Sequence, residues 1–337
     1  MSVLLDCAAP LDVHDRLLLD LDGVVYVGPA AVPGAVEALT GAHERGLVLR
    51  YVTNNASRTP AEVARHLREL GLPGGDDEVV TASQAAARLA VGAVGPGAPV
   101  LAVGGPGVTA ALEAEGLTVV TSAEDGPAAV VQGYGPDVGW RQLAEASFAV
   151  QAGALWVATN LDTTLPTPRG LAPGNGSLVA VVRTATGAEP VVAGKPEPVL
   201  FRLAAEGARS PLVVGDRLDT DIGAANAAGM PSLLVLTGVT APADLLRAVA
   251  EERPRMVAAD LSGLAEPHTA PRETADGWTC GDARARLVSG ELRVDGTGLD
   301  ALRAACAAAW QASDAGTAWT VPDDAVHALR PDVAARR

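Results

Sequence analysis

Acidic side chains occur at two places where a short apolar run of this 337-residue chain stops. Asp20 and Asp22 follow the first run, with Gly23 directly after them, and Asp216 and Asp221 follow a later one. A carboxylate can attack phosphorus, and a second carboxylate can protonate the leaving oxygen and then activate water. Gly23 permits the chain to turn at the strand end, so the two carboxylates can take different positions around one phosphate. We therefore expect Asp20 to be the nucleophile and Asp22 to be the general acid and base.

The same acids are suited to a magnesium ion. Mg²⁺ prefers oxygen ligands and usually takes only one or two carboxylates from the protein. Asp20 and Asp216 could supply these, and the main-chain carbonyl of Asp22 and water could complete the shell. Asp221 could orient the ligands from outside the shell, or it could only cap the helix expected after it. The sequence therefore predicts Mg²⁺ as the cofactor.

Lys195 is the only lysine among 25 basic residues, which indicates a position that needs a compact ammonium rather than the planar fork of arginine. An acidic pocket repels a phosphate dianion, and Mg²⁺ together with Lys195 would offset that repulsion. Thr53, Asn54 and Asn55 carry hydroxyl and amide groups, and the backbone N–H groups nearby, such as that of Gly23, add further donors for phosphate oxygens. Thr53 to Asn55 could also be no more than a helix-capping turn.

These residues follow segments that read as strands of one α/β fold. Strands alternate with amphipathic helices, which predicts a doubly wound parallel sheet with helices on both faces, and ligands bind such sheets at the carboxyl ends of the strands. Expected strands begin at Arg16 and cover residues 47–52, 99–103, 117–121, 128–132, 155–159, 179–183, 191–193, 211–214 and 232–236. Expected helices cover residues 33–46, 59–70, 139–152 and a segment ending near Ala228.

Four motifs, taken together, resemble those of the haloacid dehalogenase superfamily. They are Asp20-Leu-Asp-Gly-Val, Thr53-Asn-Asn, Gly-Lys195-Pro and Gly-Asp216-Arg-Leu-Asp-Thr-Asp221-Ile, and their order and rough spacing match over residues 15–262. The resemblance implies a Rossmann-like core and an aspartyl-phosphate at Asp20, with Asp22 as acid and base. It also implies that Thr53 and Lys195 bind phosphate, and that Asp20, Asp22 and Asp216 hold Mg²⁺ with support from Asp221.

The branch that the chain resembles carries a large α/β cap between the second and third motifs. This implies a catalytic core of residues 1–80 plus 188–264 and an inserted cap of residues 81–187. Asn160, Asp162 and Asn175 belong to segments that resemble the cap signatures of the branch, so they are candidate substrate residues. Caps of this branch often form dimers, which makes a homodimer an expectation. The branch includes phosphatases for glycerol 3-phosphate, 2-phosphoglycolate, pyridoxal phosphate and nucleoside monophosphates.

Residues 265–337 depart from most members of the family. Residues 266–277 read as a linker, residues 283–294 as a hairpin and residues 299–313 as a helix, which predicts a small α+β extension. The extension faintly resembles a fragment of the acetyltransferase fold that some glycerol-3-phosphate phosphatases carry. We therefore expect glycerol 3-phosphate as the substrate, and a packing or dimerisation role for the extension.

The composition of the chain indicates which partners, metal sites and cellular locations are to be expected. A formal net charge of −15 disfavours nucleic acid as a partner, because a basic surface supplies most of that affinity. No signal peptide and no apolar run of about 18 residues is seen, so a soluble cytoplasmic protein that does not bind membranes is expected. The three cysteines lie far apart, which predicts neither a disulfide framework nor a zinc site. A phosphoryl transferase such as a mutase, and a non-catalytic sensor of a phosphorylated ligand, remain as alternatives.

Overall fold

The computed structural model describes residues 4–167 and 169–330. The chain divides into two compact units. The first unit comprises Met1–Arg50, Leu70–Pro73 and Gly207–Arg337, and the second comprises Tyr51–Glu69 and Gly74–Glu206. The first unit therefore joins the predicted extension with part of the predicted core, and the three-part domain division stays a prediction.

A six-stranded sheet has the strand order β15-β14-β13-β1-β4-β5. Its strand β1 (Arg16–Asp20) pairs in parallel with β13 (Pro211–Gly215), with Leu18 opposite Val213. The strands β14 (Ser232–Val235) and β15 (Met256–Ala258) continue the parallel pairing. The apolar residues of β1 are fully buried, as expected for a strand that is covered on both faces. This burial explains why the run before Asp20 is entirely apolar.

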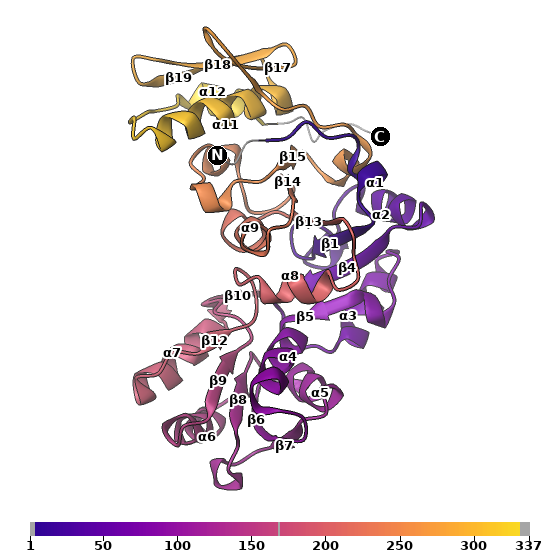
Figure 1. Cartoon of the computed structure of the whole chain (residues 1–337), viewed down its shortest axis with the longest axis vertical. Coiled ribbons are helices and arrows are strands. Elements are labelled where there is room, and N and C mark those ends of the chain that lie inside the picture. Colours follow the sequence, from indigo (N-terminus) through magenta and orange to yellow (C-terminus); the bar gives the residue numbers. More distant parts are fainter. Residues whose placement is uncertain (1–3, 168, 331–337) are drawn as a thin grey trace. The chain divides into compact units, whose positions relative to one another are not determined.

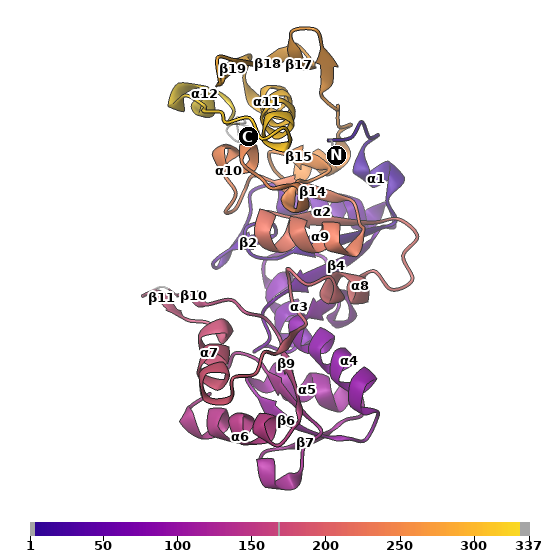
Figure 2. The same cartoon turned by 60° about the vertical axis from the view of Figure 1, so that its left-hand side comes forward.

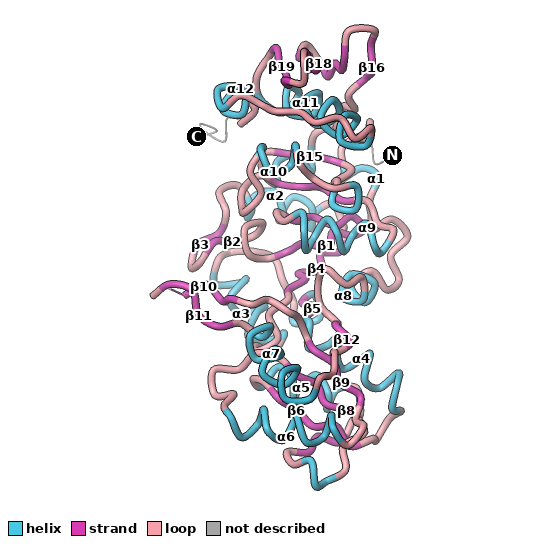
Figure 3. Tube along the Cα trace, turned by 90° about the vertical axis from the view of Figure 1, so that its left-hand side faces the viewer, coloured by secondary structure: helices cyan, strands magenta, loops and turns pink. Residues whose placement is uncertain are grey.

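The end of the first unit is an antiparallel sheet packed on a long helix. The sheet consists of β16 (Arg272–Thr274), β17 (Gly277–Cys280), β18 (Ala283–Val288) and β19 (Glu291–Asp295), in that order. Figure 3 shows α11 (Gly298–Asp314) beside these strands. Small residues on α11 let it pack closely, and Leu302, Cys306 and Trp310 are buried in one hydrophobic cluster with Leu234 and Val257 of the parallel sheet. The extension therefore shares a core with strands β14 and β15 of the parallel sheet, and with Leu218 and Ile222, which lie close to Asp221 in the sequence.

The second unit contains its own parallel sheet, with the strand order β12-β9-β8-β6-β7. These strands are β6 (Pro99–Val103), β7 (Thr118–Val120), β8 (Ala129–Gln132), β9 (Leu155–Ala158) and β12 (Val191–Val192). In Figure 1, α4 (Ala82–Val94) and α5 (Pro106–Ala114) cover one face, whereas α6 (Trp140–Gln151) and α7 (Asn175–Thr186) cover the other. The same unit pairs the end of β4 (Val48–Thr53) in parallel with β5 (Val79–Thr81). The predicted α/β class is confirmed.

Two parts of the second unit differ from the sequence prediction. Residues 179–183 were expected to form a strand, but they lie inside helix α7. The prediction was wrong because valine-rich stretches favour strands, whereas here Val179 and Val182 lie one helical turn apart and pack together in a buried cluster. The hairpin of β10 (Thr164–Thr167) and β11 (Gly170–Pro173), visible in Figure 2, was not predicted.

The segment expected as a linker, residues 266–277, also contains structure, because strand β16 lies within it. The remaining elements are short: α1 (Pro10–Val13), β2 (Tyr26–Val27), β3 (Ala30–Ala31), α2 (Ala35–Glu44), α3 (Pro60–Glu69), η1 (Asp76–Glu78), η2 (Ala123–Asp125), α8 (Val199–Ala204), η3 (Leu218–Ile222), α9 (Gly223–Ala228), α10 (Pro242–Leu246), η4 (Ala250–Glu252), η5 (Leu261–Ala265) and α12 (Asp323–Ala328). Among the described residues, no helix combines the length and apolar character that crossing a bilayer requires.

Candidate active site

Three buried carboxylates gather in the first unit. Asp20 ends strand β1, Asp216 directly follows β13, and Asp221 lies in η3. Each offers a ligand oxygen, and these oxygens lie within 4.8 Å of one another. Asp216 and Asp221 are fully buried, and Asp20 is 8% exposed. Two strand ends and one helical turn thus bring together acids that lie about 200 residues apart in the sequence.

Main-chain groups hold Asp216 in place. The Asp216 carboxylate accepts a hydrogen bond from the Val239 N–H at 2.6 Å, and its carbonyl accepts one from the Thr240 N–H at 3.2 Å. The Asp221 carboxylate accepts from the N–H groups of Asp216 and Arg217 at 3.3 and 3.1 Å. Asp221 therefore fixes the turn that follows β13, and its supporting role at the metal stays a prediction.

Two glycines allow the chain to pass close to Asp216. Gly23 has a φ of +89°, and a Cβ on it would lie 2.5 Å from an oxygen of the Asp216 carboxylate. A Cβ on Gly238 would overlap the same carboxylate. The Thr237 hydroxyl donates to the Gly23 carbonyl at 2.6 Å and ties the two loops together. Sequence reasoning missed residues 237–239, although a glycine just after the strand β14 was a usable signal.

Asp22 is placed differently from the other predicted acids. It is exposed, and it lies outside the group of three carboxylates. The next residue, Gly23, donates its N–H to the Tyr26 carbonyl at 2.8 Å, so the chain turns directly after Asp22. A general acid and base must lie within reach of the proton that it transfers, and an exposed carboxyl at this turn is accessible to water and to an entering substrate.

The carboxylate cluster has the chemistry of a magnesium site. Three acids held this close in a buried position repel one another unless a cation balances them. Their donor set consists of oxygen, which Mg²⁺ selects over softer metals. The residues present therefore fit the predicted ion.

Four of the five predicted phosphate residues, Thr53, Asn54, Asn55 and Lys195, lie in the second unit, whereas Gly23 lies in the first unit beside Asp216. Thr53 and Lys195 are buried, each at 4% exposure. The Asn54 side chain accepts from the Lys195 N–H at 2.9 Å and donates to the Lys195 carbonyl at 3.1 Å, so it pairs with that main chain as a neighbouring strand would. Asn55 accepts from the N–H and hydroxyl of Ser57, which makes its side chain part of the loop structure.

The three predicted cap residues lie next to this pair. Asn160 donates to the Asn54 carbonyl at 2.8 Å and accepts from the Asp162 N–H at 3.1 Å. The Asp162 carboxylate accepts a longer hydrogen bond, 3.4 Å, from Asn54. Asn175 is 1% exposed and donates to the Asn160 carbonyl at 2.8 Å. The structure thus brings together Asn54, Asn160 and Asn175, which the sequence places in three separate segments.

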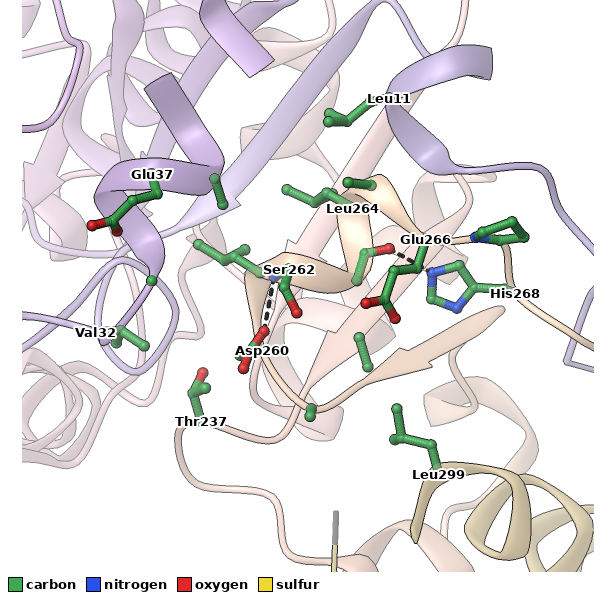
Figure 4. A pocket seen from close by; sticks show the side chains of 18 of the residues that line it. Leu11, Val32, Glu37, Thr237, Asp260, Ser262, Leu264, Glu266, His268 and Leu299 are labelled. Carbon is green, nitrogen blue, oxygen red and sulfur yellow. Dashed lines mark hydrogen bonds between the residues drawn. The ribbon is translucent and has the colours of Figure 1, made fainter. Parts of the chain in front are cut away.

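A cavity of about 1000 Å³ lies elsewhere in the first unit, between α2, η5 and the start of α11 (Figure 4). Glu37, Asp260, Glu266 and His268 are among its lining residues, and none of the three clustered aspartates lines it. Among the described residues that line the cavity, Thr237 alone also belongs to the loops around Asp216. The cavity is therefore distinct from the carboxylate cluster.

The parallel α/β sheet with a carboxylate cluster at its strand ends is typical of a Rossmann-like core that binds a metal ion, and comparisons with known proteins give the family. A haloacid dehalogenase-like hydrolase model matches residues 17–118, and a HAD-hydrolase-like model matches residues 192–264. D-glycerol 3-phosphate phosphatase from Mycobacterium tuberculosis is 48% identical over 311 residues, which cover 89% of this chain and 86% of the relative. 5'-Nucleotidase YutF from Bacillus subtilis is 38% identical over 68% of this chain and 90% of its own length.

A solved structure agrees with these matches. The crystal structure of a glycerol phosphate phosphatase from Mycobacterium tuberculosis in complex with magnesium superimposes with a TM-score of 0.85 at 44% identity. The superposition covers 94% of this chain and 95% of that one. The chain belongs to the haloacid dehalogenase-like hydrolases, and it is a phosphatase of that family. The family membership predicted from the four motifs is confirmed.

Proposed function

We propose that this phosphatase hydrolyses glycerol 3-phosphate with Mg²⁺, through an aspartyl-phosphate at Asp20. The observation that supports this most is the group of Asp20, Asp216 and Asp221, whose ligand oxygens lie within 4.8 Å of one another at the ends of strands. Asp20, Asp216 and the main-chain carbonyl of Asp22 would hold the ion, with Asp221 fixing the turn. When bound, the ion would balance the negative charge of the acids and of the phosphate.

The reaction follows in two steps. In the first, a carboxylate oxygen of Asp20 attacks phosphorus and forms an acyl-phosphate bond, while the ester P–O bond breaks and Asp22 protonates the departing alcohol oxygen. In the second, Asp22 takes a proton from a water molecule, and this water attacks phosphorus. The acyl-phosphate bond then breaks, Asp20 is restored as a carboxylate, and inorganic phosphate leaves.

The donors of the second unit would serve the phosphoryl oxygens in this scheme. We assign the Lys195 ammonium and the Thr53 hydroxyl to those oxygens, where negative charge is concentrated in the transition state. The assignment is supported by the order of the four motifs and by membership of the family. Residues 81–187 would act as the cap that closes over substrate and excludes water.

The choice of substrate is supported by the relatives. The relative named for D-glycerol 3-phosphate matches at 48% identity over most of the chain, whereas the 5'-nucleotidase matches at 38% over 68% of it. Glycerol 3-phosphate should accordingly rank first in kcat/KM among phosphomonoesters that include 2-phosphoglycolate, pyridoxal phosphate and nucleoside monophosphates. If a nucleotide exceeds it by a hundredfold or more, the substrate assignment is wrong.

The mechanism is tested by release of inorganic phosphate from p-nitrophenyl phosphate with Mg²⁺. Asp20→Asn should abolish turnover, because an amide cannot form the acyl-phosphate. Asp219→Asn is the matched control, since Asp219 lies in the same turn as Asp221 but is exposed and pairs with Arg217 at 2.8 Å. The control should keep activity within about twofold. Turnover that survives in Asp20→Asn would exclude the mechanism, and phosphate transfer to an added alcohol in place of hydrolysis would favour a mutase.

A further inference from the structure

A chain of asparagine side chains connects the start of helix α7 to Lys195. The first link is Asn54, whose side-chain amide pairs with both main-chain polar groups of Lys195, at 2.9 and 3.1 Å. The second link is Asn160, which donates to the Asn54 carbonyl at 2.8 Å. The third is Asn175, the first residue of α7, which donates to the Asn160 carbonyl at 2.8 Å.

The far end of this chain is anchored in the sheet of the second unit. The Asn175 amide also donates to the Gln132 carbonyl at the end of β8, at 3.3 Å. The Gln132 side chain is fully buried and accepts from the Trp156 indole of β9 at 3.1 Å. Figure 1 shows α7 beside this sheet, with β8, β9 and β12 as neighbouring strands. The side chains of Asn54, Asn160 and Asn175 thus connect the main chain of Lys195, which follows β12, to the sheet by hydrogen bonds.

Close packing around the links leaves little room for other arrangements. A Cβ on Gly194 would lie 2.6 Å from the Asn54 amide oxygen and would also overlap the Thr159 carbonyl. A Cβ on Gly176, in the first turn of α7, would overlap the Leu161 carbonyl next to Asn160. Both glycines let one main chain press against another, so the amide links hold segments that are already in contact.

Burial determines what the asparagines can do. Asn160 is 4% exposed and Asn175 is 1% exposed, and both hydrogens of the Asn175 amide are directed at main-chain carbonyls. The amides of both side chains already donate to main-chain carbonyls, so these side chains hold neighbouring segments together and can fix the residue that contacts the phosphate. We propose that Asn160 and Asn175 are positioning residues for Lys195, and that they set where its ammonium meets the phosphate. The inference rests on the proposed function, which assigns the phosphate to Lys195.

The test uses Asn175→Leu, which keeps the size of the side chain but removes the donor. A shift of about 1 Å in a catalytic group can cost roughly a hundredfold in rate, so kcat/KM should fall by about ten- to a hundredfold. The inhibition constant of inorganic phosphate should rise by a similar factor. The Mg²⁺ concentration for half-maximal activity should change by less than about twofold, because the carboxylates belong to the other unit. A general loss of structure would shift both constants.

A double-mutant cycle separates positioning from other effects. In the Lys195→Met background, Asn175→Leu should change kcat/KM by less than about twofold, because the residue through which it acts is gone. Asn226→Leu is the matched control, since the Asn226 amide likewise donates to two carbonyls, those of Glu251 and Arg253, in the first unit. It should leave the phosphate inhibition constant unchanged.

Two outcomes would overturn the inference: an unchanged phosphate inhibition constant in Asn175→Leu, or an effect of equal size with and without Lys195. If Asn175→Leu does not fold, Asn160→Leu can replace it in the double-mutant cycle with Lys195→Met. Asn160→Leu removes the donor to the Asn54 carbonyl, and the same two outcomes would overturn the inference. The proposed function is judged separately by Asp20→Asn. Loss of turnover in Asp20→Asn together with unchanged constants in Asn175→Leu would refute the positioning role alone.

Discussion

Gly238 offers a direct test of the carboxylate cluster. A Cβ at this position would overlap the Asp216 carboxylate and lie 2.7 Å from the Asp216 Cβ, whereas carbon atoms in contact normally stay about 3.5 Å apart. The φ of Gly238 lies outside the left-handed region, so alanine itself fits the backbone. Gly238→Ala should therefore act on Asp216 by steric displacement rather than through backbone strain.

The expected size of the effect follows from the geometry. The Asp216 side chain must move by roughly 1 Å to restore a normal contact, which is enough to lower kcat by about a hundredfold. The same movement breaks the 2.6 Å hydrogen bond from the Val239 N–H to the carboxylate. A hydrogen bond to a charged group contributes about 1.5–3 kcal/mol, so the half-saturating Mg²⁺ concentration should rise by roughly ten- to a hundredfold.

The assay is hydrolysis of p-nitrophenyl phosphate over a series of Mg²⁺ concentrations, with thermal unfolding of the same samples. Gly92→Ala in helix α4 is the control, because a Cβ there meets nothing within 4 Å. It should keep full activity and stabilise the protein by about 0.5–1 kcal/mol. If Gly238→Ala retains activity within threefold of wild type at low Mg²⁺, the position of Asp216 does not limit catalysis and the assignment of the metal site is wrong.

Three further predictions concern the first unit. Burial lowers the pKa of His268 below its usual value, so the neutral imidazole contributes fully to stability above about pH 6.5. As the pH falls below this value, the unfolding free energy should decrease by at most about 1.4 kcal/mol per pH unit. His268→Gln should make this decrease smaller. Arg253 is buried and forms a bidentate pair with the half-exposed Asp314, so Arg253→Met should lower the unfolding free energy by about 2–3 kcal/mol in urea titrations. Burial raises the pKa of Cys280 to about 11, so only about one thiol in a thousand is ionised at pH 8, and a thiol reagent should modify the more exposed Cys7 first.

Two of these predictions have a matched control. Arg209 is largely exposed, and Arg209→Met should cost less than about 0.5 kcal/mol. Denaturation in urea should bring Cys280 to the labelling rate of Cys7. Equal labelling rates in the folded protein, or a His268→Gln profile parallel to wild type, would contradict the environments described for these side chains.

The sequence was sufficient where local pattern and burial agree. The leucine run before Asp20 indicated a buried strand, and the structure has it as β1. Helix α3 begins at Pro60 and ends just before Gly71, as its terminal residues predicted. The valines of residues 179–183 show the limit of this reasoning, because a short apolar stretch does not reveal its period until its packing partners are known.

The candidate site could be predicted by residue type but not by role. The acids at positions 20, 216 and 221 were identified, and the structure places them together. Asn54 and Asn175 were expected to contact phosphate or substrate, which stays a prediction, and the structure shows that both also donate to main-chain carbonyls. Such roles depend on contacts between segments that lie from 15 to 141 residues apart in the sequence, and no local pattern encodes these contacts. Gln132 was missed for the same reason, since a glutamine that ends a strand gives no signal by itself.

The extension illustrates why a boundary in composition need not be a boundary in packing. Leu218 and Ile222 lie in η3, the same turn as Asp221, and both belong to the hydrophobic cluster that contains Leu302 and Trp310 of α11. The Trp310 indole also donates to the Leu245 carbonyl at 2.9 Å, which fixes α11 against α10. Burying one leucine contributes about 1.5–3 kcal/mol, so α11 stabilises the turn that orients the carboxylates. The extension therefore shares its hydrophobic core with the turn that contains Asp221, although its composition differs from that of the preceding chain.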